Sequence, residues 1–102
     1  MKNAETLSMG TVVQWDPEQI TTAIGGEVVA MSTRMGVYIG LDAAASDIWK
    51  RLEAPQSIGD LCDQLSREFQ GDRDMIAKDV VELLTGLREL GMVAVTGNRD
   101  AL

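Results

Sequence analysis

The sequence contains no histidine and one cysteine among its 102 residues. Histidine is the commonest general base and metal ligand of proteins, so both roles lose their usual side chain. The single Cys62 excludes an intramolecular disulfide and a cysteine-based zinc cluster, and it suits a reduced, cytoplasmic setting. Aromatic residues are also few, with two tryptophans, one tyrosine and one phenylalanine, so aliphatic side chains must fill the core.

Positive charge is scarce as well. Nine Lys and Arg stand against sixteen Asp and Glu, which gives a net charge of −7. Nucleic acids and anionic membranes require clustered basic residues, but no basic run here is longer than Lys50-Arg51. No apolar run approaches the ~18 residues of a membrane-spanning helix, and residues 1–10 lack the apolar centre of a secretory signal. We therefore expect a cytoplasmic protein with no nucleic-acid partner and no membrane partner.

The length predicts one domain. We expect a loose lead-in over residues 1–10, a folded domain over 11–95 and a frayed tail over 96–102. Short β-prone runs occupy the first part of the chain: TVVQWDP at 11–17, EVVAMST at 27–33 and VYIGL at 37–41. The last two are separated by a glycine-containing turn, which predicts a hairpin.

From Asp42 the apolar spacing changes to that of helices. Asp42 is a good N-cap for a first helix that ends before Pro55, and Ser57 caps a second that Gly71 closes. A third helix runs from about 72 to 90 and ends at Gly91, a residue suited to the left-handed conformation. The short apolar segment 92–95 that follows is either a strand or a segment packed on the core.

The elements together predict an α+β, winged helix-turn-helix-like fold, in which a three-stranded antiparallel sheet is followed by three helices. The third helix carries an apolar stripe that covers about half of its circumference. Either this helix is central and contacts both other helices and the sheet, or one of its flanks lines a groove beside an exposed strand edge.

Residues able to carry out chemistry are missing. Cys62 lies on the apolar stripe of the second helix, where a thiol behaves as a small hydrophobe with a raised pKa. The acidic residues fall at helix starts such as Asp60 and Asp74 or on polar helix faces. No phosphate-binding glycine motif is present. We expect no catalytic residue, no metal site and no cofactor, and hence not an enzyme.

Residues 27–95 carry an ordered set of motifs that resembles the PqqD-like proteins. Leu41-Asp42 ends a strand where the family usually has Leu-Asn, Ile48-Trp49 lies in the first helix, and Asp79-Val80 lies near the start of the third. The strand Gly36-x-Tyr38-x-Gly40-Leu41 is similar to that of stand-alone members serving lasso-peptide biosynthesis. Ala43-Ala44-Ala45 departs from the family, which usually has bulkier or glycine-containing sequence there.

The resemblance implies a non-catalytic recognition element for the leader segment of a ribosomally made precursor peptide. In such proteins the leader adds to the sheet as an extra strand against the third helix. Its expected partners are a separate cysteine-protease-like leader peptidase and a cyclase. The peptide-binding residues would be Val37, Tyr38, Ile39, Gly40, Leu41, Ala77, Val80, Val81 and Leu84. By strand alternation the first, third and fifth of these face the helices, and Tyr38 and Gly40 face away.

Three alternatives stay open. The first is a PqqD proper, which presents the precursor of the quinone cofactor to a radical-SAM enzyme. The second is a winged-helix DNA-binding protein, although the third helix has few basic residues. The third is a structural subunit with no peptide groove.

Overall fold

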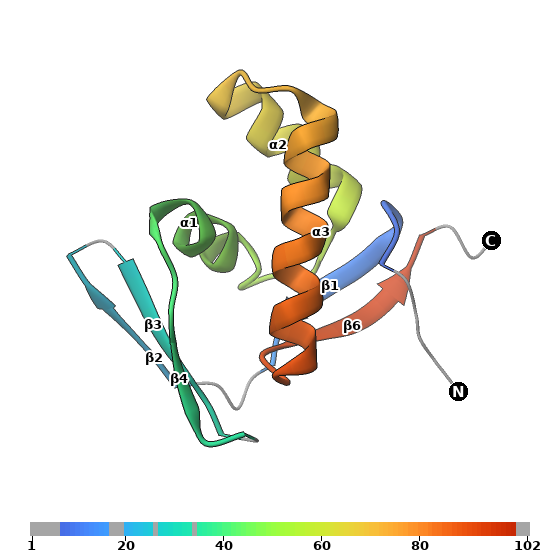
Figure 1. The fold of residues 1–102 in the computed structure, drawn as a ribbon. Coiled ribbons are helices and arrows are strands. Elements are labelled where there is room, and N and C mark those ends of the chain that lie inside the picture. The colour runs from blue at the N-terminus through green and yellow to red at the C-terminus, as the bar shows by residue number, and fades with distance from the viewer. Residues whose placement is uncertain (1–6, 17–19, 26, 34, 100–102) are drawn as a thin grey trace.

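The computed structural model describes residues 7–16, 20–25, 27–33 and 35–99. Two three-stranded antiparallel sheets lie on either side of the helices (Figure 1). One sheet has the order β2-β3-β4 and the other β5-β1-β6. The strands are β1 (Thr11–Trp15), β2 (Ile20–Ile24), β3 (Glu27–Ser32), β4 (Val37–Gly40), β5 (Gln56–Ser57) and β6 (Val93–Asn98), and the helices are α1 (Ala43–Arg51), α2 (Ile58–Phe69) and α3 (Arg73–Glu89).

The predicted fold class is confirmed, because a three-stranded antiparallel sheet is followed by three helices. The membership of that sheet differs from the prediction. The run at 11–17 supplies β1, which pairs with β5 and β6, and the third strand of the first sheet is β2. β1 joins the second sheet because its residues reach partners far along the chain: Val13 lies opposite Val95, and Trp15 donates its backbone N–H to the Leu52 carbonyl.

Both ends of the domain are more ordered than predicted. The segment 92–95, left open between strand and core packing, becomes part of β6, which runs on through Asn98. At the other end Leu7 is buried, and the Met9 carbonyl accepts the backbone N–H of Gly59. Arg99 donates its N–H to the Gly10 carbonyl and joins the two ends (2.8 Å). The folded part therefore extends beyond 11–95, while residues 1–6 and 100–102 lie outside the described residues.

The helices begin where the sequence predicts. The side chain of Asp42 accepts the N–H of Ala45 at the start of α1 (2.8 Å), and Ser57 accepts that of Asp60 at the start of α2 (3.1 Å). Such caps satisfy backbone donors that have no partner inside the helix. Asp72 caps α3 in the same way.

The predicted closure of α2 at Gly71 involves the preceding residue as well. Gln70, not Gly71, adopts the left-handed conformation (φ 53°). Gly71 lies in a tight place, since a Cβ there would lie 3.1 Å from Cδ1 of Ile76 on α3 and that side chain would have to shift slightly. The glycine thus permits close packing between the turn and the first turn of α3.

A pair of tryptophans packs the second sheet against α1. Trp15 of β1 stacks on Trp49 of α1 with ring centroids 5.3 Å apart and an interplanar angle of 22°. The indole N–H of Trp15 also donates to the Trp49 carbonyl. Such aromatic pairs contribute about 0.5–1.5 kcal/mol beyond the area they bury. The largest fully buried side chains around them include Leu52, Ile58, Leu61, Leu84 and Met92.

Two buried serines attach the β3–β4 hairpin to the helices. The Ser46 hydroxyl of α1 accepts the Val28 N–H (2.8 Å) and donates to the Leu41 carbonyl (3.0 Å), so it bridges the two groups that would form the next hydrogen bond between the strands. At the other end of the hairpin, Ser32 donates from its hydroxyl to the Leu90 carbonyl after α3 (2.7 Å). Both serines are at most 1% exposed.

We expect Ser46→Ala to lower the free energy of unfolding by about 1–3 kcal/mol, because it leaves the Val28 N–H and the Leu41 carbonyl buried without that partner. Urea unfolding followed by circular dichroism measures the change. Ser66→Ala is the matched control, since its half-buried hydroxyl bonds only locally to the Asp63 carbonyl. Equal stabilities of Ser46→Ala and Ser66→Ala would contradict the bridging role.

Candidate functional site

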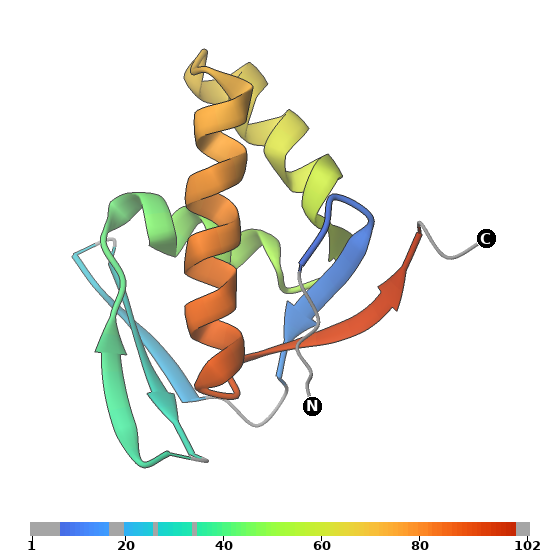
Figure 2. The same ribbon diagram turned by 45° about the vertical axis from the view of Figure 1, so that its right-hand side comes forward.

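β4 is an edge strand. It pairs with β3 on one side, and no other strand among the described residues pairs with its second side. It runs alongside α3 in both views of the molecule (Figures 1 and 2). An unpaired edge presents backbone donors and acceptors to which another strand can bind. β4 therefore offers a ready position for a fourth strand next to α3.

The hydrogen bonds of the hairpin determine which backbone N–H and C=O groups of β4 point to the open edge. Leu41 donates its N–H to the carbonyl of Val28, which lies directly opposite (2.8 Å). In an antiparallel pair these bonded positions alternate along the strand. The backbone groups of Ile39 therefore point toward β3, whereas those of Tyr38 and Gly40 point to the open edge.

The side chains of β4 divide as the alternation predicts. Leu41 is buried, Ile39 is half-buried and Val37 is 41% exposed, so the face turned to the helices becomes progressively less covered toward the hairpin turn. Tyr38 lies on the other face and is 73% exposed. The inward face of β4 thus carries apolar side chains that the domain itself covers only in part.

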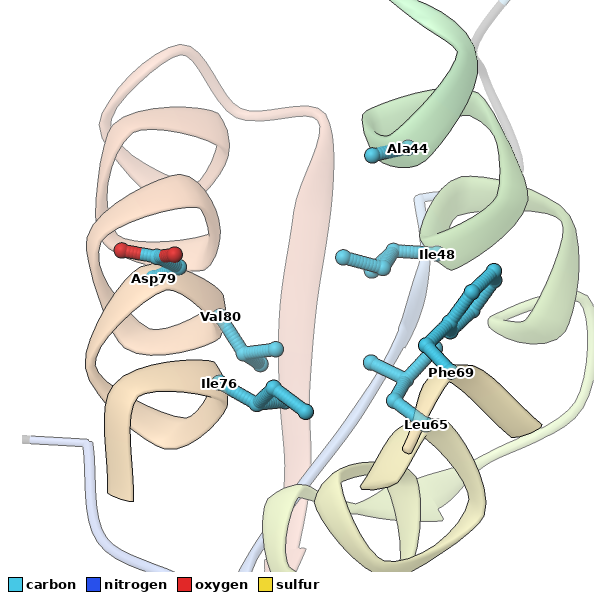
Figure 3. A pocket seen from close by; sticks show the side chains of 7 residues that line it. All are labelled: Ala44, Ile48, Leu65, Phe69, Ile76, Asp79 and Val80. Carbon is cyan, nitrogen blue, oxygen red and sulfur yellow. The ribbon is translucent and has the colours of Figure 1, made fainter. Parts of the chain in front are cut away.

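A pocket of about 200 Å³ opens where the three helices meet. Figure 3 shows Ile76 and Val80 pointing into it from α3, whereas Asp79 lies at the edge beside the α3 backbone. Its lining is apolar apart from Asp79 and consists of Ala44, Ile48, Leu65, Phe69, Ile76, Asp79 and Val80. The volume is below the roughly 300–1,000 Å³ of small-molecule sites, so the pocket suits one or two apolar side chains.

The pocket adjoins β4 through the start of α1. Leu41 ends the inward face of β4, and Ala44 of the pocket lies only three residues further along the chain. Phe69 is 62% exposed although it lines the pocket, so an aromatic ring stands partly in solvent at the entrance. The open edge of β4 and this pocket are the two parts of the candidate site, and the start of α1 connects them along the chain.

The predicted residues of α3 fall in different places. Val80 lines the pocket, whereas Leu84 is fully buried in the core. Ala77 and Val81 are partly buried and pack on the core outside the pocket lining. At about 100° per residue, Val81 lies about 200° around the helix from Asp79, on the opposite flank. The sequence predicted the apolar arc of α3, but the structure turns its other flank toward the pocket.

Five pocket residues were missed by the sequence analysis: Ala44, Ile48, Leu65, Phe69 and Ile76. The sequence contains a pattern that could have predicted two of them. Phe69 is a large apolar residue in the last turn of α2, and Ile76 is one in the first turn of α3. An aromatic residue and an aliphatic residue on either side of a glycine turn indicate two helix ends that share an apolar contact.

The pKa shifts of Cys62 and Glu68 arise from burial and from an ion pair between helices. Burial raises the pKa of the Cys62 thiol, and the positive charge of Arg73 opposes this rise only in part. Arg51 of α1 pairs with Glu68 of α2 through two hydrogen bonds (2.8 and 2.6 Å), and these bonds lower the pKa of Glu68. In the described part of the chain no three potential metal ligands come together, and no helix is long and apolar enough to cross a membrane.

Comparison with known proteins agrees with this geometry. The model of the family described as coenzyme PQQ synthesis protein D (PqqD) matches residues 27–93, which run from β3 to the start of β6. The chain belongs to the PqqD family. The resemblance found in the sequence is thereby confirmed, and the matched region contains β4, the pocket and all of α3.

Relatives of two kinds are found. The PqqA binding protein of Gluconobacter oxydans (strain 621H) is 41% identical over 49 residues, which are 48% of this chain and 51% of that protein, so the match spans about half of the relative's length. Two solved structures share the fold. TbiB1 in complex with the TbiA(beta) leader peptide has a TM-score of 0.74 and 26% identity, and covers 83% of this chain and 99% of its own. Lasso peptide synthetase B1 complexed with the leader peptide has a TM-score of 0.70 and 28% identity, and covers 80% and 96%.

Two proline substitutions test the alternation along β4. Ile39→Pro removes an N–H that bonds to β3, so we expect a loss of about 1–3 kcal/mol in the free energy of unfolding. Tyr38→Pro removes an N–H that points outward, where edge strands tolerate proline, so we expect a loss below about 1 kcal/mol. Urea unfolding of the two variants measures both values. The reverse order would show that the register of the outward groups is shifted by one residue.

Proposed function

We propose that this protein binds the leader segment of a ribosomally synthesised precursor peptide and presents it to processing enzymes, without catalysing a reaction itself. The leader adds to the β2-β3-β4 sheet as a fourth strand beside β4. The observation that carries the proposal is the open β4 edge, in a fold shared over 80% or more of the chain with two proteins whose structures hold a leader peptide.

The edge supplies affinity that depends little on sequence. Strand addition forms main-chain hydrogen bonds, here with the outward N–H and C=O groups of Tyr38 and Gly40. Gly40 has open space where a Cβ would lie, so a neighbouring backbone can approach the strand closely. The Ser32 and Ser46 hydrogen bonds hold β4 in place before binding, which reduces the ordering cost of association.

The pocket supplies selectivity. Alternate residues of an added strand face the helices, where the partly covered Val37 and Ile39 meet them. Beyond the α1 end of β4, the same peptide reaches the pocket that contains Ala44 and Phe69. An apolar leader side chain that enters this pocket would be removed from water at roughly 25 cal/mol per Å² of buried apolar surface.

Two precursor classes remain candidates. The structural matches, which extend over most of the chain, favour a lasso-peptide leader. The relative that binds PqqA favours the precursor of a quinone cofactor, although its match spans a shorter segment. In the lasso pathway the partners would be a separate leader peptidase and a cyclase. A DNA-binding role is disfavoured by the net charge of −7.

The direct test is fluorescence anisotropy with the labelled leader of any short precursor peptide that is encoded beside the gene. We expect saturable binding with a dissociation constant below about 1 μM, which corresponds to roughly 8 kcal/mol. A scrambled leader of equal composition should not bind. A PqqA peptide and a lasso leader tested side by side identify the precursor class. A folded protein that binds neither would refute the proposed function and favour a structural subunit.

Strand addition predicts a difference between the two edges of the sheet. We expect Tyr38→Pro to weaken leader binding at least about tenfold, because the outward donor is lost and the added strand cannot pair there. Ala23→Pro on β2 is the matched control, since the same alternation points the Ala23 backbone away from β3 at the opposite edge. Equal affinities of the two folded variants would locate the peptide elsewhere.

The pocket gives a second matched pair on neighbouring residues of α1. Ala44 and Ala43 are both exposed, but only Ala44 lines the pocket. We expect Ala44→Phe to fill the pocket and weaken leader binding about tenfold or more, and Ala43→Phe to change it less than about twofold. Anisotropy titrations measure both, with circular dichroism as the check of folding. Unchanged binding by Ala44→Phe would remove the pocket from the site.

A further inference from the structure

Gly86 lies inside α3, three residues before the helix ends, where the domain itself gives no reason for a glycine. The described glycines with a positive φ are Gly25, Gly36 and Gly91, so Gly86 is not required by its backbone conformation. A Cβ at position 86 would meet nothing within 4 Å, so it is not required by packing either. Glycine is one of the least favourable residues in a helix interior. The domain thus has an exposed gap on α3 at a position where most other residues would make the helix more stable.

The position of Gly86 on α3 shows where that contact would be. At about 100° per residue, Gly86 lies about 20° from Asp79, about 60° from Leu83 and about 40° from Leu90 around the helix axis. Asp79 is at the pocket, and the Leu90 carbonyl is bonded to Ser32 at the hairpin that carries β4. Gly86 therefore lies on the flank of α3 that leads from Asp79 at the pocket to Leu90 at the hairpin of β4.

We infer that Gly86 leaves space on α3 for one bulky apolar side chain of the peptide strand that adds to β4, and that this space selects which leader sequences bind. The inference rests on the proposed function. A strand beside β4 directs alternate side chains toward the helices, and the surface they meet has a missing side chain at Gly86. Half-buried leucines flank the gap at positions 83 and 90. An aromatic or long aliphatic leader residue fits these surroundings, whereas a charged one does not.

If the inference is right, filling the space at Gly86 makes the protein more stable but lowers its affinity for the leader. Gly86→Ala should raise the melting temperature by about 4 °C, because alanine favours the helix and meets no neighbour. The same variant should bind the leader encoded beside the gene less tightly, by about tenfold, because its methyl group occupies the space for the peptide side chain. Gly86→Leu should weaken binding further. If Gly86 does not contact the peptide, Gly86→Ala would raise the melting temperature and leave the affinity for the leader unchanged.

Thr85→Leu is the matched control. Thr85 is the exposed neighbour of Gly86 and lies about 100° around the helix, on the side away from Asp79 and Leu90. The Thr85→Leu substitution introduces the same leucine one position away on α3. Any general effect of an apolar residue on the helix surface therefore appears in both variants. We expect Thr85→Leu to bind the leader within about twofold of the unsubstituted protein.

An alanine scan of the leader against both forms of the protein locates the contact. Truncating the one leader residue that faces Gly86 should weaken binding to the unsubstituted protein and restore much of the affinity of Gly86→Leu, which gives a double-mutant coupling at that position alone. If the unsubstituted protein binds the leader and Gly86→Leu binds it equally well, or if coupling appears at no position, the inference is wrong while the proposed function stands. If the unsubstituted protein does not bind the leader, both fail.

Discussion

The position of β4 depends on two buried serine hydroxyls, because the strand is paired along one edge only. Ser32 ties the hairpin to the end of α3, and Ser46 takes the place of the next hydrogen bond between the strands and ties the other end to α1. A four-residue strand with one open edge would otherwise be free to twist away from the helices. With both ends held, the outward groups of Tyr38 and Gly40 have a fixed direction next to α3. The open edge is therefore held in place in the free domain before any strand adds to it.

Features set by local sequence were predictable. The β3–β4 hairpin follows from its glycine turn, and Gly36 adopts the positive φ that such turns require. The N-caps Asp42 and Ser57 were visible as short polar residues ahead of apolar periodicity. Pairing between distant strands was not predictable in this way. Nothing in the run 11–17 identifies β6 as its neighbour, because that choice depends on the packing of the whole domain.

The site was predicted in outline only. The strand and the third helix were identified, and the inward and outward faces of β4 were assigned correctly from alternation. The rotation of α3 about its own axis was not, since an apolar arc of half the circumference does not specify which flank packs against α2 and which faces β4. Ala77 and Val81 were therefore chosen where Ile76 and Asp79 line the pocket. The pocket also needs Ala44 and Leu65 from two other helices, and their convergence is a tertiary property.

The pairing of β1 with β6 has a consequence for the order in which the chain assembles. It places Thr11 opposite Asn98, so the second sheet closes a loop that contains most of the protein, whereas the sheet with β4 is built from strands within residues 20–40. Contacts between distant residues carry a larger entropy cost of loop closure and form more slowly. We expect the β2-β3-β4 hairpins to form early and the β1–β6 pair to close last. On the ribosome, β6 is also the final strand to be made, so the domain completes its fold after the edge that carries the site already exists.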